Sequence, residues 1–207
     1  MYYDRFTRVL HLTIAVGGVV QLLSSLLMTH PKPGRAGDAL YAMHDAGGQV
    51  LLALLMIHWL WSLLRQGEVK LLQLWPWFTP SQIPGIVADA RQMLSHFWQR
   101  KIPEGGRFSP LAAAVQGVGL MLATLLGGSG LLLSNAAAEG VAMVGWLHDV
   151  KEGHELLGTL MWFYLIVHAS MAMLHHWAGH DTVRAMLRIW EKEQVATANH
   201  EHVAGKE

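Results

Sequence analysis

HELLGTLMWFYLIVHASMAMLHHW, residues 154–177, is the stretch that indicates the fold class of this chain. The run from Leu156 to Ala178 is almost wholly apolar and is close to the roughly 20 residues that a helix needs to cross a bilayer core. A backbone in lipid must satisfy its own hydrogen bonds, and the run lacks the two-residue alternation of barrel strands. It therefore predicts a transmembrane helix.

Three further stretches have the same apolar character: Val9 to Thr29, Leu40 to Leu64 and Leu111 to Leu133. The 207 residues are 52% hydrophobic and only 14% charged, which is far from the composition of a soluble surface. The sequence therefore predicts an all-α fold, a four-helix transmembrane bundle. Residues 1–190 are expected to form the membrane domain, and residues 191–207 a polar C-terminal tail.

Basic residues are distributed unevenly around these spans. Of the 15 lysines and arginines, only Lys32, Arg35 and Lys151 lie on the side reached after the first span, and the other 12 lie on the opposite side. The positive-inside rule therefore predicts both termini in the cytoplasm. The formal net charge is zero, which gives no argument for a nucleic-acid partner, so membrane lipid is the expected surrounding.

The longest connection, residues 66–109, contains an amphipathic segment beyond Pro84. Apolar residues recur there at intervals of three and four from Ile86 to Trp98, with charged and polar residues between them. The pattern predicts an interfacial helix on the cytoplasmic face of the membrane. An ordinary connecting helix packed on the bundle would have the same pattern.

A spacing of histidine and glycine occurs twice, as His44, Gly48 and His58 and as His154, Gly158 and His168. Fourteen helical residues rise about 21 Å and turn through nearly whole revolutions, so each histidine pair lies on one stripe of its helix at two depths. The chain has no cysteine, which excludes iron–sulfur clusters held by thiolates and covalent haem attachment. Neutral imidazole is a standard axial ligand of haem iron, and ionisable side chains in spans are usually functional. The repeat therefore favours two b-type haems, one above the other, over hydrogen bonds between helices.

The expected topology pairs some of these histidines. His44 and His154 both open spans that begin on the outer side, so they share a depth and would bind opposite faces of one iron. His168 lies about four turns below His154. Its partner is either His58, at equal depth on the second span, or His11, one turn into the first.

Gly48 and Gly158 each follow an outer histidine by one turn. Their lack of a side chain would let a porphyrin approach the backbone. Close packing between helices would require small residues equally well.

Three segments resemble the bacterial cytochrome b561 and nickel-hydrogenase cytochrome b superfamily: RFTRVLHLTIA around His11, HDAGG from His44, and the quoted run from His154. The long connection, with GGRFSP before the third span, is most similar to the cytochrome b (gamma) subunit of respiratory formate dehydrogenases. The likeness covers about Asp4 to Leu187. It implies a di-haem cytochrome b domain with His44 and His154 on the outer haem and His11 and His168 on the inner one.

One departure from the family concerns His58, which stands where many members carry an arginine near the inner haem. A pair of His58 and His168 would resemble the cytochrome b of quinol–cytochrome c oxidoreductases. The basic residues beside His11 fit the superfamily, so we favour His11 as the ligand and expect His58 to contact a propionate or a quinone.

Arg107 and Ser109 precede the third span at the inner surface, near where the related subunits place menaquinone. We therefore expect a quinone head group between this entry and the inner haem. A basic residue there also follows from the orientation rule alone.

Together these features predict an electron-transfer subunit of an oxidoreductase in a respiratory chain of the bacterial inner membrane. It would carry electrons between the quinone pool and a partner redox subunit, and the resemblance implies an iron–sulfur protein as that partner. The alternatives are a stand-alone cytochrome b561-like quinone oxidoreductase and a histidine-lined metal transporter.

Overall fold

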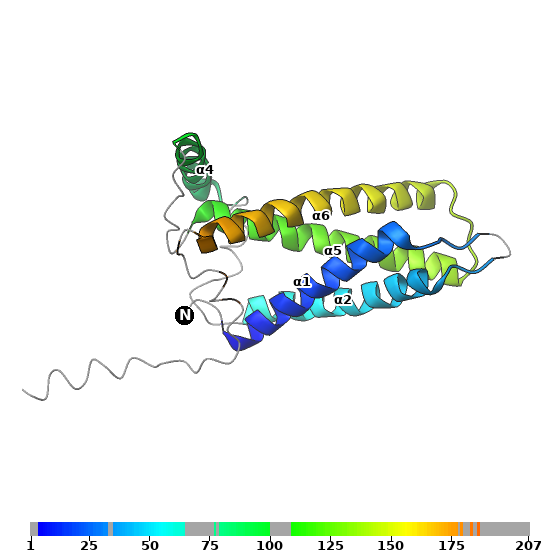
Figure 1. Ribbon diagram of the computed structural model, residues 1–207. Helices are drawn as coiled ribbons and strands as arrows, with labels where there is room; N and C mark the ends of the chain where they lie inside the picture. Colours follow the sequence, from blue (N-terminus) through cyan, green and yellow to red (C-terminus); the bar gives the residue numbers. More distant parts are fainter. Residues whose placement is uncertain are drawn as a thin grey trace, which may run out of the picture.

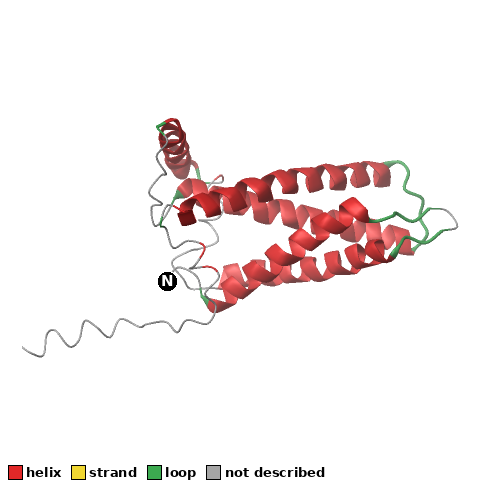
Figure 2. Cartoon of the chain, viewed as in Figure 1, coloured by secondary structure: helices red, strands yellow, loops and turns green. Residues whose placement is uncertain are grey.

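The computed structural model of the chain describes residues 4–32, 35–64, 77, 79–99, 109–177, 179, 183 and 186. Four helices in it are long and apolar enough to cross a membrane: α1 (Arg5–Leu27), α2 (Ala39–Leu64), α5 (Pro110–Ala138) and α6 (Trp146–Trp177). A short 3-10 turn, η2 (Pro80–Gln82), and helix α4 (Ile83–Trp98) lie between α2 and α5 in the sequence. Figure 2 shows helices and loops and no strand over the described residues. The predicted all-α transmembrane bundle is confirmed.

The four long helices lie along a common axis and pack in the order α1, α2, α5, α6 (Figure 1). The main contacts join α1 to α2, α2 to α5, and α5 to α6. Short connections make consecutive helices antiparallel, so the α1–α2 and α5–α6 connections share one end, here called the loop end. The start of α1 and helix α4 lie at the opposite end, here called the terminal end. Helices α1 and α6 stand at the two ends of the packing order.

Large apolar side chains cover the outside of this bundle. Phe163 and Ile166 on α6 are 71% and 60% exposed, and Leu27 on α1 is 69% exposed. So many exposed apolar side chains would be costly in water but match the hydrocarbon of a bilayer. The chain is therefore a membrane protein, with lipid as its surroundings.

The start of α1 is tied to the end of α2. Asp4 caps α1, because the backbone N–H and the hydroxyl of Thr7 both donate to its carboxylate at 2.8 Å. The indole N–H of Trp61 on α2 donates to the Thr7 hydroxyl at 3.1 Å. Partial burial works to raise the pKa of the Asp4 carboxyl, but the hydrogen bonds from Thr7 and Trp61 outweigh it and hold the pKa below its ordinary value.

Helix α4 is joined to the start of α5 by one carboxylate. The hydroxyl of Ser109 caps α5 by accepting from the N–H of Ala112 at 3.1 Å, and it donates to Asp89 of α4 at 2.8 Å. Figure 1 shows α4 turned away from the long axis of the bundle at the terminal end. Trp98 of α4 is 77% exposed. The predicted helix thus exists, and its position on the cytoplasmic membrane surface stays a prediction.

The beginning of α6 differs from the prediction. We expected the fourth span to begin near Leu156, whereas α6 begins at Trp146. The pairs Lys151–Glu155 and His148–Glu152, each four residues apart, support the helix through this polar segment, which a search for apolar runs does not detect. His154 therefore lies two turns inside α6 instead of at its start. The expected tail, residues 191–207, lies outside the described residues.

Candidate functional site

Four histidines from three helices form two pairs. His44 of α2 and His154 of α6 face each other near the loop end, with ring centres 6.4 Å apart and ring planes at 84°. His11 of α1 and His168 of α6 face each other nearer the terminal end, with ring centres 6.5 Å apart and planes at 51°. None of the four residues is fully buried. Each pair joins α6 to a helix that is not its main packing neighbour: α2 in the loop-end pair and α1 in the other.

The spacing within each pair matches two ligands on one metal ion. A bond from a metal ion to an imidazole nitrogen is about 2 Å long, and the ring centre lies about 1 Å further, so imidazoles on opposite faces of one ion have ring centres about 6 Å apart. Along α6, the two levels are separated by about 21 Å of helix rise. The geometry thus suits two ions held one above the other.

Hydrogen bonds assign the proton of the His44 ring. Its Nδ1 lies 3.1 Å from the backbone carbonyl of Gln21 and 3.0 Å from the hydroxyl of Ser24. A carbonyl only accepts, so Nδ1 carries the proton and donates, while the Ser24 hydroxyl donates to the same carbonyl at 2.9 Å. The Nε2 atom of His44 therefore keeps its lone pair for a metal ion.

His154 is held in the same way from α5. The hydroxyl of Ser129 donates to the carbonyl of Leu125 at 2.7 Å, and its oxygen lies 2.9 Å from Nδ1 of His154. Because the hydroxyl proton is engaged with the carbonyl, the oxygen accepts from Nδ1–H of the imidazole. Both loop-end histidines thus have Nε2 free to ligate. The spacing of the histidines did not indicate that Ser24 and Ser129 contact them. The signal in the sequence that could have found these serines is the presence of a small polar residue inside an apolar span.

A tyrosine positions the other ligand on α6. The ring of Tyr164 stacks on that of His168, one turn later, with centres 5.5 Å apart and planes at 14°. Across the interface, a Cβ atom added to Gly119 of α5 would lie 2.2 Å from the Tyr164 ring and hydroxyl. Gly119 therefore makes room for Tyr164, and neither residue was singled out from the sequence.

His58, the alternative inner ligand, lies beside the terminal-end pair. It is close enough to His11 for an electrostatic interaction between the two rings. Within the described part of the chain, the ring contacts of His168 are with His11 and Tyr164. The geometry therefore brings His11, and not His58, against His168.

The two glycines of the repeat have different surroundings. A Cβ atom on Gly48 would be in ordinary contact with the Gln21 side chain, 3.7 Å away. A Cβ atom on Gly158 would meet no described atom within 4 Å. The described residues thus leave the backbone of Gly158 uncovered, whereas the backbone of Gly48 faces Gln21.

Ser109, one of the two expected quinone contacts, lies at the start of α5. Arg107 lies outside the described residues. Ser109 is described, and its hydroxyl proton is engaged with Asp89.

The paired imidazoles fit a haem better than a bare ion. The described residues contain no group of three or more His, Cys, Asp or Glu side chains that could hold a metal ion. Two imidazoles complete a coordination sphere only if other donors occupy the plane between them, as the four nitrogens of a porphyrin do. The donor set therefore fits haem iron held by one histidine on each face.

These features define a helical membrane protein with the ligand geometry of a b-type cytochrome. The family model for prokaryotic cytochrome b561 matches residues 2–188, and the chain belongs to that family. It is therefore a bacterial membrane cytochrome that binds b-type haem and takes part in electron transfer. Searches of curated proteins and of solved structures gave no significant match.

Proposed function

We propose that this cytochrome binds two b-type haems and carries electrons between the quinone pool and a partner redox subunit. The observation that carries the proposal is the presence of two histidine pairs with ring centres 6.4 and 6.5 Å apart. His44 and His154 would hold one haem, and His11 and His168 the other. A bound b-type haem supplies a one-electron couple between ferric and ferrous iron.

The residues of the chain have distinct tasks in this proposal. Ser24 and Ser129 hold the loop-end imidazoles in the tautomer that presents Nε2 to the metal. Tyr164 restricts the orientation of the His168 ring by stacking on it. The apolar spans exclude water from both levels, and burial is one of the factors by which a protein adjusts the potential of a haem.

The membrane orientation and the partner are part of the same proposal. The excess of basic residues on one side supports a location in the bacterial inner membrane with both termini in the cytoplasm. The resemblance to formate dehydrogenase gamma subunits supports a partner that contains iron–sulfur clusters. On this basis quinone would bind between Ser109 and the His11–His168 pair at the terminal end, and the partner would dock at the loop end.

The experiment that tests the proposal is reduction of the haem by a quinol. The purified protein is reconstituted in nanodiscs and mixed with duroquinol, and the haem absorption is followed. Reduction of most of the haem within seconds would support exchange with the quinone pool. If dithionite reduces the haem and duroquinol does not, the proposed exchange with the quinone pool is contradicted. The protein would then be an electron-transfer protein that uses another donor.

A further inference from the structure

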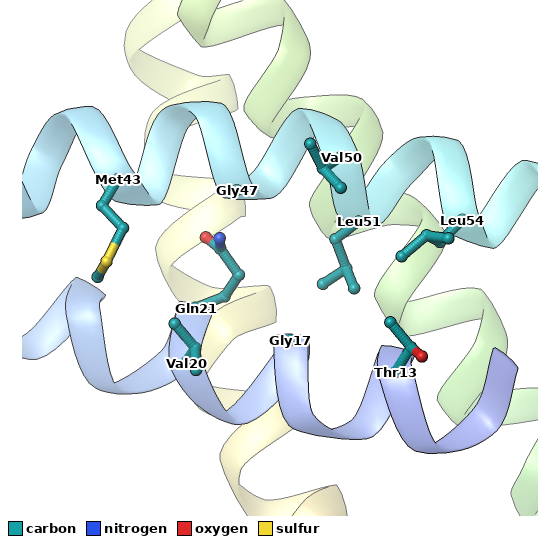
Figure 3. Close-up of a pocket in the computed structure, with 9 residues that line it drawn as sticks. All are labelled: Thr13, Gly17, Val20, Gln21, Met43, Gly47, Val50, Leu51 and Leu54. Carbon is teal, nitrogen blue, oxygen red and sulfur yellow. The ribbon is translucent and has the colours of Figure 1, made fainter. Parts of the chain in front are cut away.

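A cavity of about 290 Å³ lies between α1 and α2. Figure 3 shows its lining, which runs along both helices. Nine residues line it: Thr13, Gly17, Val20, Gln21, Met43, Gly47, Val50, Leu51 and Leu54. The volume is near the lower end of the range for pockets that bind small molecules.

Gln21 provides the polar chemistry of this cavity. Its amide reaches from α1 toward Gly47 of α2 (Figure 3), and a Cβ atom on Gly47 would lie 2.4 Å from its nitrogen. The hydroxyl of Thr13, the other polar side chain in the lining, donates to the carbonyl of Val9 at 2.9 Å. The aliphatic lining thus presents one amide, which both donates and accepts hydrogen bonds. An amide in hydrocarbon is costly without such bonds.

The cavity opens toward the lipid. Val50, Met43 and Val20, which line it, are 61%, 44% and 41% exposed. An occupant therefore enters sideways from the bilayer and must be mainly apolar. To satisfy the amide of Gln21, it must also carry a hydrogen-bonding group, which a plain acyl chain lacks.

Gln21 also connects the cavity to the loop-end histidine pair. Its backbone carbonyl accepts the hydrogen bond from Nδ1 of His44 at 3.1 Å. Gly47 and Gly48, which face its side chain, lie within four residues of His44 on α2. A molecule bound to the amide would thus contact the residue that orients a proposed haem ligand.

We propose that this cavity binds the ring of a quinone, with the Gln21 amide N–H donating to a quinone carbonyl and the amide oxygen accepting from a quinol hydroxyl. The aliphatic side chains pack on the ring, and the tail extends into the lipid past Val50. The inference rests on the proposed exchange with the quinone pool. It adds a quinone site toward the loop end to the one proposed near Ser109 at the terminal end.

Photolabelling of the haem-loaded protein in nanodiscs tests this site. An azido-quinone is the probe, decylubiquinone is the competitor, and mass spectrometry locates the label. We expect label in the segments 13–21 and 43–54 that decylubiquinone displaces. Gln21→Leu should weaken the competition about fivefold to tenfold, the loss expected for one neutral hydrogen bond. Gln49→Leu is the matched control, because this glutamine of α2 is exposed and bonds to Ser134 outside the cavity.

Three results would overturn the site. Label concentrated near Ser109, with none in the cavity segments, would place the quinone at the terminal end. Label in the cavity that decylubiquinone does not displace, or equal competition in Gln21→Leu and the parent protein, would identify a groove for lipid chains. Absorption spectra before labelling check that Gln21→Leu retains its haem. Reduction by duroquinol in the same samples reports separately on the proposed function.

Discussion

Ser129 of α5 holds His154 of α6 through a hydrogen bond of 2.9 Å between the serine oxygen and Nδ1 of the imidazole. An acceptor at Nδ1 increases the basicity of a ligating imidazole, which stabilises ferric over ferrous iron. Ser129→Ala should therefore raise the midpoint potential of one haem and weaken its binding about tenfold, the lower end of the usual effect of such partners.

A redox titration followed by haem absorption measures this change. Ser134→Ala is the control, because Ser134 lies on the same helix and bonds to Gln49 instead of a histidine. The assignment fails if Ser129→Ala leaves both potentials and the haem content at the parent values.

The identity of the second terminal-end ligand can be tested by comparing two alanine variants. His11 lies against His168 with ring centres 6.5 Å apart, so we expect His11→Ala to lose about one haem per chain. His58→Ala should retain both haems, with at most a shifted potential, because His11 is the ring that lies against His168. Haem quantitation on the two purified variants decides the matter. The reverse pattern would make His58 the ligand.

Gly119 is expected to be intolerant of a side chain. A Cβ atom there would overlap the ring of Tyr164 at 2.2 Å and displace it from His168. We expect Gly119→Ala to destabilise the protein by about 1–3 kcal/mol, the usual cost of overpacking, and to alter the spectrum of one haem.

The control for Gly119 is Gly128→Ala on the same helix, where an added Cβ atom meets no described atom within 4 Å. Alanine is the better helix former, so this variant should be neutral or slightly stabilised. Thermal unfolding in detergent measures both. Equal melting temperatures for the two variants would contradict the role given to Gly119.

The cap of α1 should make stability depend on pH. Asp4→Ala should cost about 1 kcal/mol at pH 7, the typical value for loss of an N-cap. Folding lowers the pKa of Asp4, so the ionised carboxylate stabilises the protein at pH values above the ordinary pKa of 3.8. This stabilisation is lost as the pH falls through the lower pKa of the folded protein. The difference in melting temperature between the parent and Asp4→Ala should therefore shrink below pH 3.8.

Asp4→Asn separates the charge from the cap, because asparagine also caps helices. It should retain most of the stability at pH 7. If the difference in melting temperature between Asp4→Ala and the parent stays constant down to pH 2, the ionised carboxylate does not stabilise the cap.

The long helices could be predicted because each contains an apolar run as long as the bilayer core. The start of α6 could not, since its first turns are polar and are supported by pairs such as Lys151–Glu155. The depths of His44 and His154 follow from their positions along two spans. Their contacts with Ser24 and Ser129 depend on the rotation of neighbouring helices about their axes, which spacing within one helix does not define.

The same limit applies to the cavity between α1 and α2. Gln21 and Gly47 lie on different spans, and nothing in their sequence positions indicates that the amide of one covers the backbone of the other. The predicted contact at Arg107 lies outside the described residues, so it remains a hypothesis from the sequence.

The central claim is that two histidine pairs each hold a b-type haem. Quantitation of the purified parent protein by pyridine haemochrome, divided by its concentration from amino-acid analysis, tests it most directly. We expect two b-type haems per chain, because each of the two pairs joins separate helices at the spacing of an axial ligand pair. A ratio of one haem per chain after expression with ample haem would contradict it.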